Sequence, residues 1–356
     1  MSASRITFHD GQDDQGAALE RIARTVRAQL AGLPALSGHG ADAPRRPLFT
    51  GIGASYAALA VPVDTLRRAG LPAQRVLASD IEEGLTGFDT DLLIGVSQSG
   101  RSSETIAAFR AAAGTRTLAV LNVAPSPLGE LADLTVGLGN ESDSYASTIG
   151  FTGTVLALDL IAGRLSGRTE DPWADVAELT RTVRARASTA VERLRVRAAG
   201  CVAADCVASG ASRTSAEEAA LLLREVPRMP AAASATRNYL HGEMESAGNT
   251  LHLVFGDGRE IDLAHSLAGA GHTTLLVTTR TVPPEGDLHV VRLPVTAPAP
   301  RVVLETVVVQ ELVQALSLER GVPIESFVFA NDDTKEGGVD PGDFAVASPV
   351  LGAGSA

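Results

Sequence analysis

The sequence predicts an α/β protein made of two halves of similar size, each with a mostly parallel sheet covered by helices. Short apolar runs alternate with helical stretches along most of the chain. A charged helical stretch, Pro172 to Arg197, separates two such alternating sets. Strand–helix alternation at this spacing is typical of βαβ units, and therefore of a parallel sheet. The 356 residues, 45% of them hydrophobic, are enough to bury two cores.

The first half begins with an amphipathic helix predicted over residues 16–33, because apolar residues recur there at helical spacing. A link rich in Gly, Ala and Pro follows, from Leu36 to Pro47. The predicted strands are the apolar runs Leu48–Gly53, Gln74–Ser79, Leu92–Ser97, Thr117–Val123 and Leu134–Leu138. The predicted helices are Ala57–Ala69, Ser103–Ala113 and Thr152–Leu165.

The second half repeats this architecture without a clear internal sequence repeat. Its predicted strands are Val202–Ala208, Leu251–Phe255, Thr274–Thr278 and Leu288–Leu293. Its predicted helices are Ser215–Glu225, Ile261–Ala270 and Val302–Gly321. The tail from Ala330 to Ala356 is rich in Gly, Asp and Pro and has no periodicity.

Composition narrows the classes of partner and compartment. Forty-two acidic and thirty basic residues give a formal charge of −12, which argues against nucleic acid and anionic membranes. Two cysteines, Cys201 and Cys206, cannot form a disulfide framework, and no Cys/His cluster has zinc spacing. The N-terminus has no apolar signal-peptide region, and no apolar run reaches the ~20 residues of a membrane span. We therefore expect a soluble cytoplasmic protein.

The turn after the third predicted strand carries the clearest binding signal. It runs from Ser97 through Gln98, Ser99 and Gly100 to Ser102, and it opens a helix. Glycine allows the tight turn, while hydroxyls and free backbone amides at a helix N-terminus form a cradle for an anion. Serines there also serve as ordinary helix caps, but four hydroxyls within seven residues exceed what one cap needs. A phosphate site and a purely structural turn both remain open.

Two further turns carry glycine or hydroxyl groups. The segment Gly51–Tyr56 follows the first strand, but it lacks the third glycine of a dinucleotide fingerprint and the lysine of a P-loop. The segment Tyr145–Thr148 contributes two hydroxyls at another predicted strand-to-helix turn. Since ligands sit at the carboxyl ends of strands in open α/β sheets, the three turns can converge on one anionic, hydroxyl-rich ligand.

Together these motifs resemble those of the sugar isomerase (SIS) family. The segments Gly53–Tyr56, Ser97–Gly100 and Ala146–Thr148 stand in the order and spacing of that family. The isomerase half of glucosamine-6-phosphate synthase and the stand-alone deaminases are the members most similar. In the second half, Glu217–Glu225 resembles the family helix that ends in a catalytic glutamate, and a His-Gly pair follows at His241.

The resemblance implies two tandem SIS domains, each a three-layer, flavodoxin-like sheet flanked by helices. We expect these parts: 1–46, N-terminal helix and linker; 47–168, first SIS domain with the phosphosugar site; 169–198, connecting helix; 199–330, second SIS domain; 331–356, C-terminal tail.

The resemblance also implies roles for individual residues. Those expected to bind the 6-phosphate of a hexose are Ser97, Gln98, Ser99 and Ser102; those expected around the sugar are Ser55, Ser147 and Thr148. Glu225 is expected to move a proton between C1 and C2, and His241 to assist ring opening from the partner subunit of a homodimer. A carboxylate base in a partly closed pocket suits removal of the C2 proton. Taken alone, Glu225 reads as a solvated helix carboxylate and His241 as a loop histidine.

The chain departs from the family pattern at several positions. Ala54 stands where the family has threonine, and Arg237–Leu240 replaces an acidic, lysine-bearing pattern. An ungapped reading from Gly321 puts Asp332 at the position of the family's C-terminal catalytic lysine, while Lys335 lies three residues beyond. Lys335 is the only lysine in the chain. A lysine kept among arginines suits attack on a carbonyl or proton transfer near neutral pH, although chance retention in a tail is an equal reading.

A further acidic pair, Glu82 and Glu83, follows the second predicted strand. Acidic residues after a strand often only begin a helix. In SIS-type etherases, however, a pair of glutamates removes the C2 proton and protonates the group that leaves C3, so Glu83 or Glu82 is a candidate acid.

The resemblance predicts a cofactor-free enzyme acting on an amino or acetamido hexose 6-phosphate by proton abstraction at C2. A synthase reaction is not expected, because no N-terminal cysteine or glutaminase domain precedes the first helix. The altered sugar-facing positions favour 2,3-dehydration of N-acetylglucosamine 6-phosphate, with glucosamine-6-phosphate deaminase/isomerase as the alternative. A non-catalytic phosphosugar sensor is the rival from another class, but such sensors usually carry a further domain. The partner expected besides the sugar is a second copy of the chain.

Overall fold

The computed structural model describes residues 5–36, 43–81, 84–329 and 331–338. Its first sheet has five parallel strands in the order β2-β1-β3-β4-β5. These strands are β1 (Pro47–Gly51), β2 (Gln74–Leu77), β3 (Leu92–Ser97), β4 (Arg116–Leu121) and β5 (Leu134–Gly137). The order reverses between β1 and β3, and this switch point is where open α/β sheets bind ligands.

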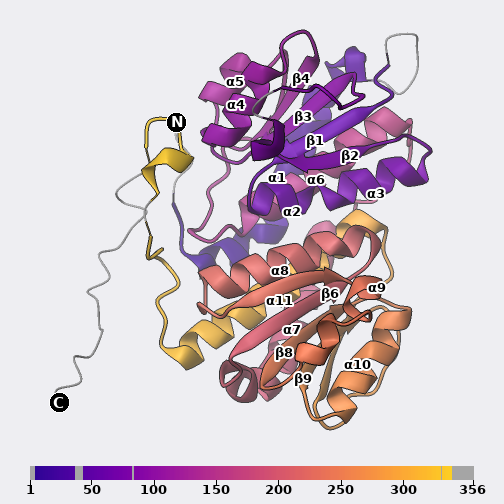
Figure 1. The fold of residues 1–356 in the computed structure, drawn as a ribbon, viewed down its shortest axis with the longest axis vertical. Coiled ribbons are helices and arrows are strands. Elements are labelled where there is room, and N and C mark those ends of the chain that lie inside the picture. The colour runs from indigo at the N-terminus through magenta and orange to yellow at the C-terminus, as the bar shows by residue number, and fades with distance from the viewer. Residues whose placement is uncertain (1–4, 37–42, 82–83, 330, 339–356) are drawn as a thin grey trace, which may run out of the picture.

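The second sheet has the same topology. It is parallel, in the order β10-β9-β8-β6-β7, which read from the other edge repeats the order of the first sheet. Its strands are β6 (Ala203–Ala208), β7 (Ala231–Ala235), β8 (Thr250–Phe255), β9 (Thr273–Thr278) and β10 (Leu288–Arg292). The predicted fold class, two flavodoxin-like α/β domains in tandem, is confirmed (Figure 1).

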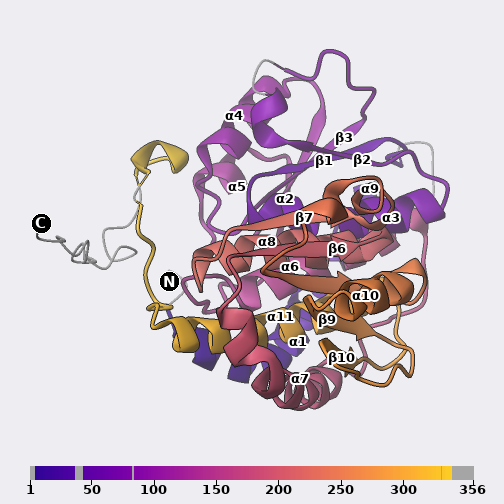
Figure 2. The ribbon, with the colours of Figure 1, turned by 60° about the horizontal axis from the view of Figure 1, so that its bottom comes forward.

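Helices cover both faces of each sheet, as parallel strands require. The helices of the first half and the connection are α1 (Phe8–Ala31), α2 (Ala54–Ala58), α3 (Ala60–Arg68), α4 (Ser103–Ala111), α5 (Pro127–Leu131), α6 (Ile149–Ser166) and α7 (Val176–Ala199). Those of the second half are α8 (Arg213–Glu225), α9 (Thr236–Tyr239), α10 (Arg259–Gly269) and α11 (Pro298–Arg320). Figure 2 shows α7 and α10 on either side of the second sheet.

Alternating strand residues feed separate cores, because successive side chains point to opposite faces. In β8, Leu253 and Phe255 pack with α7, α8 and α11, whereas Val254 packs with the side chains of α10. In β3, Ile94 belongs to the core with α1 and α6, and Leu93 to the core with α4. Strands buried on both faces explain why the apolar runs were continuous rather than alternating.

Helix α8 joins the two halves. It packs against α2 of the first half (Figure 1), and the Thr214 hydroxyl donates to the Ala57 carbonyl at 2.9 Å. Glu225 is the C-terminal residue of α8. It therefore belongs to the second half but lies on the helix that packs against the first half.

The predicted elements and the structure differ in a few places. Helix α1 begins at Phe8, because Thr7 caps it by accepting a hydrogen bond from the Asp10 amide. The helix expected over 57–69 is split at Leu59 into α2 and α3. Strand β7 was missed, because its sequence of four alanines and a serine has low β-propensity.

By length and composition, helix α6 is apolar enough to cross a membrane. The sequence criterion did not mark it as a candidate span, because its 18 residues fall short of the length of about 20 applied there. Most of it is buried in the first core. A core helix passes this test as readily as a membrane span.

Candidate functional site

The Ser97–Ser102 turn lies at the switch point of the first sheet. Strand β3 ends at Ser97, whose hydroxyl lies 3.0 Å from that of Ser102, and Ser102 is the N-cap of α4. The Ser102 side chain caps no amide of α4, so in the described residues no side-chain cap competes with an anion for the first amides of this helix. Gly100 has φ 65°, and a Cβ there would lie 2.1 Å from the Ser126 hydroxyl. The turn therefore combines hydroxyls, amides and the glycine that its backbone requires, which suits a phosphate.

Gln98, Ser99 and Arg101 form hydrogen bonds that stabilise the turn. Ser99 accepts a hydrogen bond from the Arg101 amide at 3.3 Å. The Gln98 carbonyl accepts from the amides of Asn122 and Val123, both at 3.0 Å, and so ties the turn to the end of β4. The side chains of Gln98 and Ser99 are partly exposed.

The turn after β1 lies beside it, because β1 pairs with β3 and places Thr50 opposite Gly95. Gly53 adopts φ 56° and precedes the short helix α2 with no side-chain cap. Ser55 is partly exposed there. The structure thus brings Ser55 and the Ser97–Ser102 turn to one edge of the first sheet.

A buried aspartate organises the third turn. Asp143 accepts hydrogen bonds from the Ser147 hydroxyl at 2.6 Å and from the Thr148 amide at 3.0 Å and hydroxyl at 3.2 Å. Thr148 is fully buried, and a Cβ on Gly11 of α1 would lie 2.1 Å from its hydroxyl. The Thr148 hydroxyl therefore supports the turn from beneath, packed against α1, whereas Ser147 is partly exposed. Sequence reasoning missed Asp143.

Glu225 lines a cavity of about 570 Å³ at the end of α8. The remaining lining residues come from the last turn of α8, the turn after it and the segment after α11: Arg224, Arg228, Met229, Pro230, Phe327, Val328 and Phe329. Burial raises the pKa of Glu225 to about 7, from an ordinary value of 4.5. A carboxyl group with such a pKa both accepts and releases a proton near neutral pH.

A second glutamate, Glu218, lies two turns earlier on α8 and is 1% exposed. Burial, and then the negative charges of Glu225 and Asp143, hold its pKa well above the ordinary value. Its Oε2 has no hydrogen-bond partner among the described residues. Burial therefore disfavours the ionised form of Glu218, and its carboxyl group interacts electrostatically with both Glu225 and Asp143. Sequence reasoning missed this role, although the spacing of seven residues places both glutamates on one helix face.

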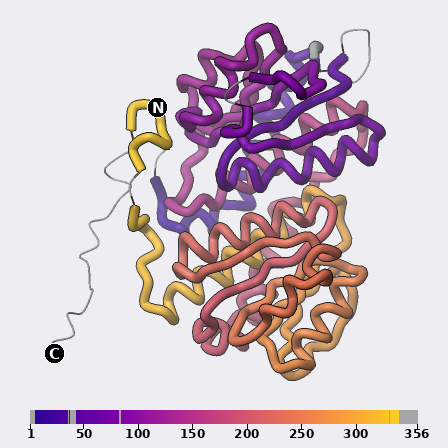
Figure 3. Tube along the Cα trace, viewed as in Figure 1, coloured from indigo at the N-terminus to yellow at the C-terminus, as the bar shows by residue number. Residues whose placement is uncertain are grey.

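The C-terminal segment connects the cavity with the Ser97–Ser102 turn. Phe327 packs on Tyr145 with ring centroids 4.2 Å apart, and the chain then runs to the first half (Figure 3). There Lys335 forms a backbone bridge with Ser102, and the Glu336 amide donates to the Arg101 carbonyl at 2.8 Å. The backbone at Lys335 is the part that pairs with the turn, and the role expected for this lysine stays a prediction.

Arg101 holds this segment in place. Its guanidinium donates to the carbonyls of Glu336 at 3.0 Å and Gly338 at 2.6 Å. Arg110 of α4 adds an ion pair with Glu336 at 3.0 Å. The residues 331–338 are therefore a docked segment over the N-terminus of α4.

His241 lies away from the Ser97–Ser102 turn. His241 follows α9, beyond the edge strand β7, and its side chain is exposed. In the described residues no contact brings it to the Ser97–Ser102 turn, which leaves its expected role in a partner's site a prediction. Glu82 and Glu83 lie outside the described residues.

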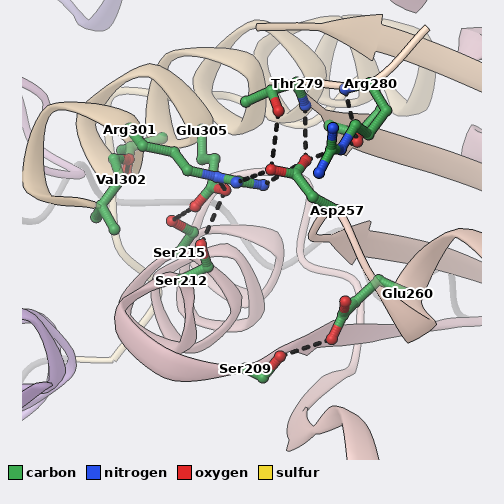
Figure 4. A network of polar contacts seen from close by, with 12 residues as sticks. Ser209, Ser212, Ser215, Asp257, Glu260, Thr279, Arg280, Arg301, Val302 and Glu305 are labelled. Atoms are coloured by element: carbon green, nitrogen blue, oxygen red, sulfur yellow. Dashed lines mark hydrogen bonds and ion pairs between the residues drawn. The ribbon is translucent and has the colours of Figure 1, made fainter. Parts of the chain in front are cut away.

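The equivalent switch point of the second sheet is filled by its own carboxylates (Figure 4). Glu260 of α10 accepts hydrogen bonds from the Ser209 and Thr236 hydroxyls, both at 2.6 Å, and from the Gly258 amide at 3.3 Å. Burial opposes ionisation, but these donors prevail and lower the pKa of Glu260. A carboxylate thus receives the hydroxyls and helix amide that would otherwise face an anion.

Asp257 and Arg301 extend this network. Asp257 accepts from the Thr279 amide and hydroxyl at 2.8 Å and pairs with Arg301 at 2.6 Å. Arg301 also pairs with Glu305 of α11 at 2.8 Å. These side chains therefore satisfy one another across the mouth of the second sheet.

Solved structures share the fold of this protein, with its two sheets, over nearly the whole chain. A putative phosphosugar isomerase from Clostridium difficile 630 superposes with a TM-score of 0.77 at 18% identity, over 90% of this chain and 95% of that one. The C-terminal domain of glucosamine-fructose-6-phosphate aminotransferase from Francisella tularensis gives 0.72 at 19% identity, over 89% and 97%. The chain has the tandem SIS fold.

Two other comparisons complete this result. Glucosamine-6-phosphate deaminase from Thermotoga maritima has the same tandem SIS fold, with a TM-score of 0.73 at 18% identity over 89% of this chain and 96% of that one. A glutamine–fructose-6-phosphate aminotransferase (isomerizing) from Symbiobacterium thermophilum is 33% identical over 204 residues. That match covers 52% of this tandem SIS chain and 31% of the relative, about a third of its length. No family model matches the chain.

Proposed function

We propose that this chain is a phosphosugar enzyme that moves the C2 proton of an amino hexose 6-phosphate. The observation that carries the proposal is Glu225, a partly buried carboxyl group with a pKa of about 7 in the wall of a cavity at the end of α8. Its fold neighbours include proteins described as phosphosugar isomerases and a glucosamine-6-phosphate deaminase.

In this proposal the Ser97–Ser102 turn holds the 6-phosphate through hydroxyls and the α4 amides. Ser55 and Ser147 contact the sugar, and the Lys335 segment closes over the turn. Glu225 in its ionised form removes the C2 proton and returns it to C1. Burial raises the pKa of Glu218 and so disfavours a second negative charge beside Glu225, which makes Glu218 a positioning residue.

A single carboxyl group suffices to move a proton between neighbouring carbons. The 2,3-dehydration expected from the sequence needs in addition an acid that protonates the departing 3-hydroxyl. In the described lining of the cavity Glu225 is the one carboxyl group. Proton transfer by Glu225 alone supports aldose–ketose isomerisation, followed by hydrolytic release of ammonia when the C2 nitrogen is free, whereas the acids expected for dehydration, Glu82 and Glu83, lie outside the described residues.

The deciding experiment follows C2–H exchange in heavy water by NMR with glucosamine 6-phosphate and with its N-acetyl form. We expect exchange, with ketose and ammonia from the free amine. An unsaturated product from the acetylated sugar would instead establish dehydration. Binding of the sugar phosphate without C2–H exchange would support the alternative of a non-catalytic phosphosugar sensor.

The phosphate turn has its own test. Replacing Ser97 and Ser99 by alanine removes two hydroxyls that can donate to the phosphate, each worth about 1.5–3 kcal/mol as a charge-assisted bond. Calorimetry should show weaker binding of glucosamine 6-phosphate and unchanged folding. Unchanged affinity would place the phosphate elsewhere.

A further inference from the structure

The cavity beside Glu225 is lined by apolar and cationic side chains as well as by this carboxyl group. Its described lining is mainly apolar, with Met229, Pro230 and the ring of Phe327, and Phe329 at its edge is 79% exposed. Two arginines, Arg224 and Arg228, complete it. A wall of this kind suits a ligand with an apolar part and an anionic end.

The two arginines have no acidic partner in the described part of the chain. Arg228 makes one side-chain contact, a hydrogen bond of 3.5 Å from Nη2 to the Ser326 carbonyl, and Arg224 is exposed. Neither contributes to the pKa of Glu225, for which burial is the one cause. Their charges are therefore not used to hold the Glu225 carboxylate ionised.

The backbone places Arg228 in an unusual conformation. It has φ 53°, the left-handed region in which glycine or asparagine would sit with less strain. The turn between α8 and β7 thus presents a long cationic side chain at a position where its backbone would favour a small residue. Strained non-glycine residues of this kind gather at binding sites.

We propose that this cavity binds a carboxylate-bearing substituent on the C2 nitrogen of the phosphosugar, with Arg224 and Arg228 holding the carboxylate. The inference rests on the proposed function, because Glu225 at the C2 proton puts the substituents of C2 nearest to this wall. The apolar residues Met229 and Phe327 pack along the arm that joins the nitrogen to the carboxylate. The preferred substrate is then an N-acylated amino sugar phosphate whose acyl group ends in a carboxylate.

A matched pair of probes tests the charge alone. N-succinyl-glucosamine 6-phosphate ends its arm in a carboxylate, and N-levulinoyl-glucosamine 6-phosphate has the same arm ending in a methyl ketone. Calorimetry should show about tenfold or more tighter binding of the succinyl probe, since tenfold corresponds to 1.4 kcal/mol. Arg224→Gln and Arg228→Gln should each reduce this preference, and the double variant should abolish it.

Control measurements distinguish a failure of this inference from a failure of the proposed function. Arg24→Gln, an exposed arginine of α1 outside the cavity, should leave both affinities unchanged. Melting temperatures of the arginine variants should match the wild type, which excludes unfolding. Equal affinity for the two probes, or a preference that survives the double variant, overturns the inference even if glucosamine 6-phosphate binds and exchanges its C2 proton. If glucosamine 6-phosphate neither binds nor exchanges, the proposed function fails and this inference with it.

Discussion

Glu225 shows how a single residue acquires its chemistry from its place in the fold. At the C-terminus of α8 it is carried into the domain boundary, where burial raises its pKa from 4.5 to about 7. The unfolded chain would release this proton near pH 4.5, whereas the folded chain keeps it up to about pH 7. The stabilising contribution of the protonated form is therefore complete below pH 4.5 and is lost as pH rises through 7.

Activity should follow the opposite course, because the base is the ionised form. We expect kcat/KM for C2–H exchange to rise with pH and level off above about 7. Glu225→Gln should lower turnover on the order of 10²–10⁴-fold while substrate still binds. Its unfolding free energy at pH 8 to 9 should exceed that of the wild type by on the order of 1–3 kcal/mol. Wild-type exchange rates in this variant would transfer the role to Glu82 or Glu83.

Asp143 illustrates a residue that acts through a turn. Asp143→Asn keeps one acceptor oxygen but replaces the other by an NH₂ group, so one of the bonds from Ser147 and Thr148 is lost. We expect a loss of about 1.5–3 kcal/mol in urea unfolding, the usual value for a hydrogen bond to a charged group. Sugar binding should weaken as well, whereas Asp133→Asn, which changes a carboxylate at the start of β5, should leave sugar binding unchanged.

The sequence indicated the residues with a distinctive local pattern and missed those that depend on tertiary contacts. Ser97 and Ser102 stand in a glycine-containing turn before a helix, so a phosphate cradle could be predicted there. Asp143 and Glu218 have ordinary neighbours in the sequence, and only packing shows that they are buried. The buried hydroxyl of Thr148 is likewise a consequence of α1, which no local motif reveals.

At the scale of elements, periodicity located the strands buried on both faces. Strand β3 was predicted at its observed bounds, because its apolar run ends at the hydroxyl-rich turn. Strand β7 could not be predicted, because an edge strand of alanines is held by pairing with β6 rather than by its own propensity. The tail was expected to have no periodicity, and residues 331–338 are instead positioned by contacts with α4 and the turn before it.

The docked segment 331–338 yields a prediction about this element. Arg101→Ala removes both hydrogen bonds to the carbonyls of Glu336 and Gly338, and so weakens the attachment of the segment, to which the backbone bridge and the Arg110 pair still contribute. We expect faster proteolysis within residues 331–338 and a higher KM for the sugar phosphate. Arg116→Ala, on the exposed start of β4, is the control. An unchanged cleavage rate would show that Arg101 does not anchor the segment.

The whole molecule has two sheets of the same topology but different use. Among the described residues, no side chain caps the helix after the turn at the first switch point, whereas at the second Glu260 and Asp257 accept hydrogen bonds from the corresponding donors. Under the proposed function the second half would supply Glu225 to the site of the first half, and we predict one sugar phosphate bound per chain. Duplication of the fold could be predicted from the alternation of strands and helices. The difference between the two switch points depends instead on the side chains of Asp257 and Glu260, which follow β8.

The homodimer expected from the family resemblance remains a prediction at this scale. If His241 acts in a partner's site, each mixed dimer of Glu225→Gln and His241→Ala chains has one intact site, so an equimolar mixture should recover up to about a quarter of wild-type activity. Refolding the two inactive variants together and measuring C2–H exchange tests this. A fully active monomer in light scattering would contradict it, as would mixtures that stay inactive although mixed dimers form.

The contact between Lys335 and Ser102 joins residues far apart in the order of synthesis. The Ser97–Ser102 turn leaves the ribosome early, Glu225 follows more than a hundred residues later, and the segment that docks on the turn comes later still. A nascent chain that has completed its first sheet therefore has a phosphate cradle without a base or a cover. Chemistry on the sugar must wait until both later parts have emerged and docked, so chains cut short before Lys335 would be able to hold a phosphosugar but not to enclose it.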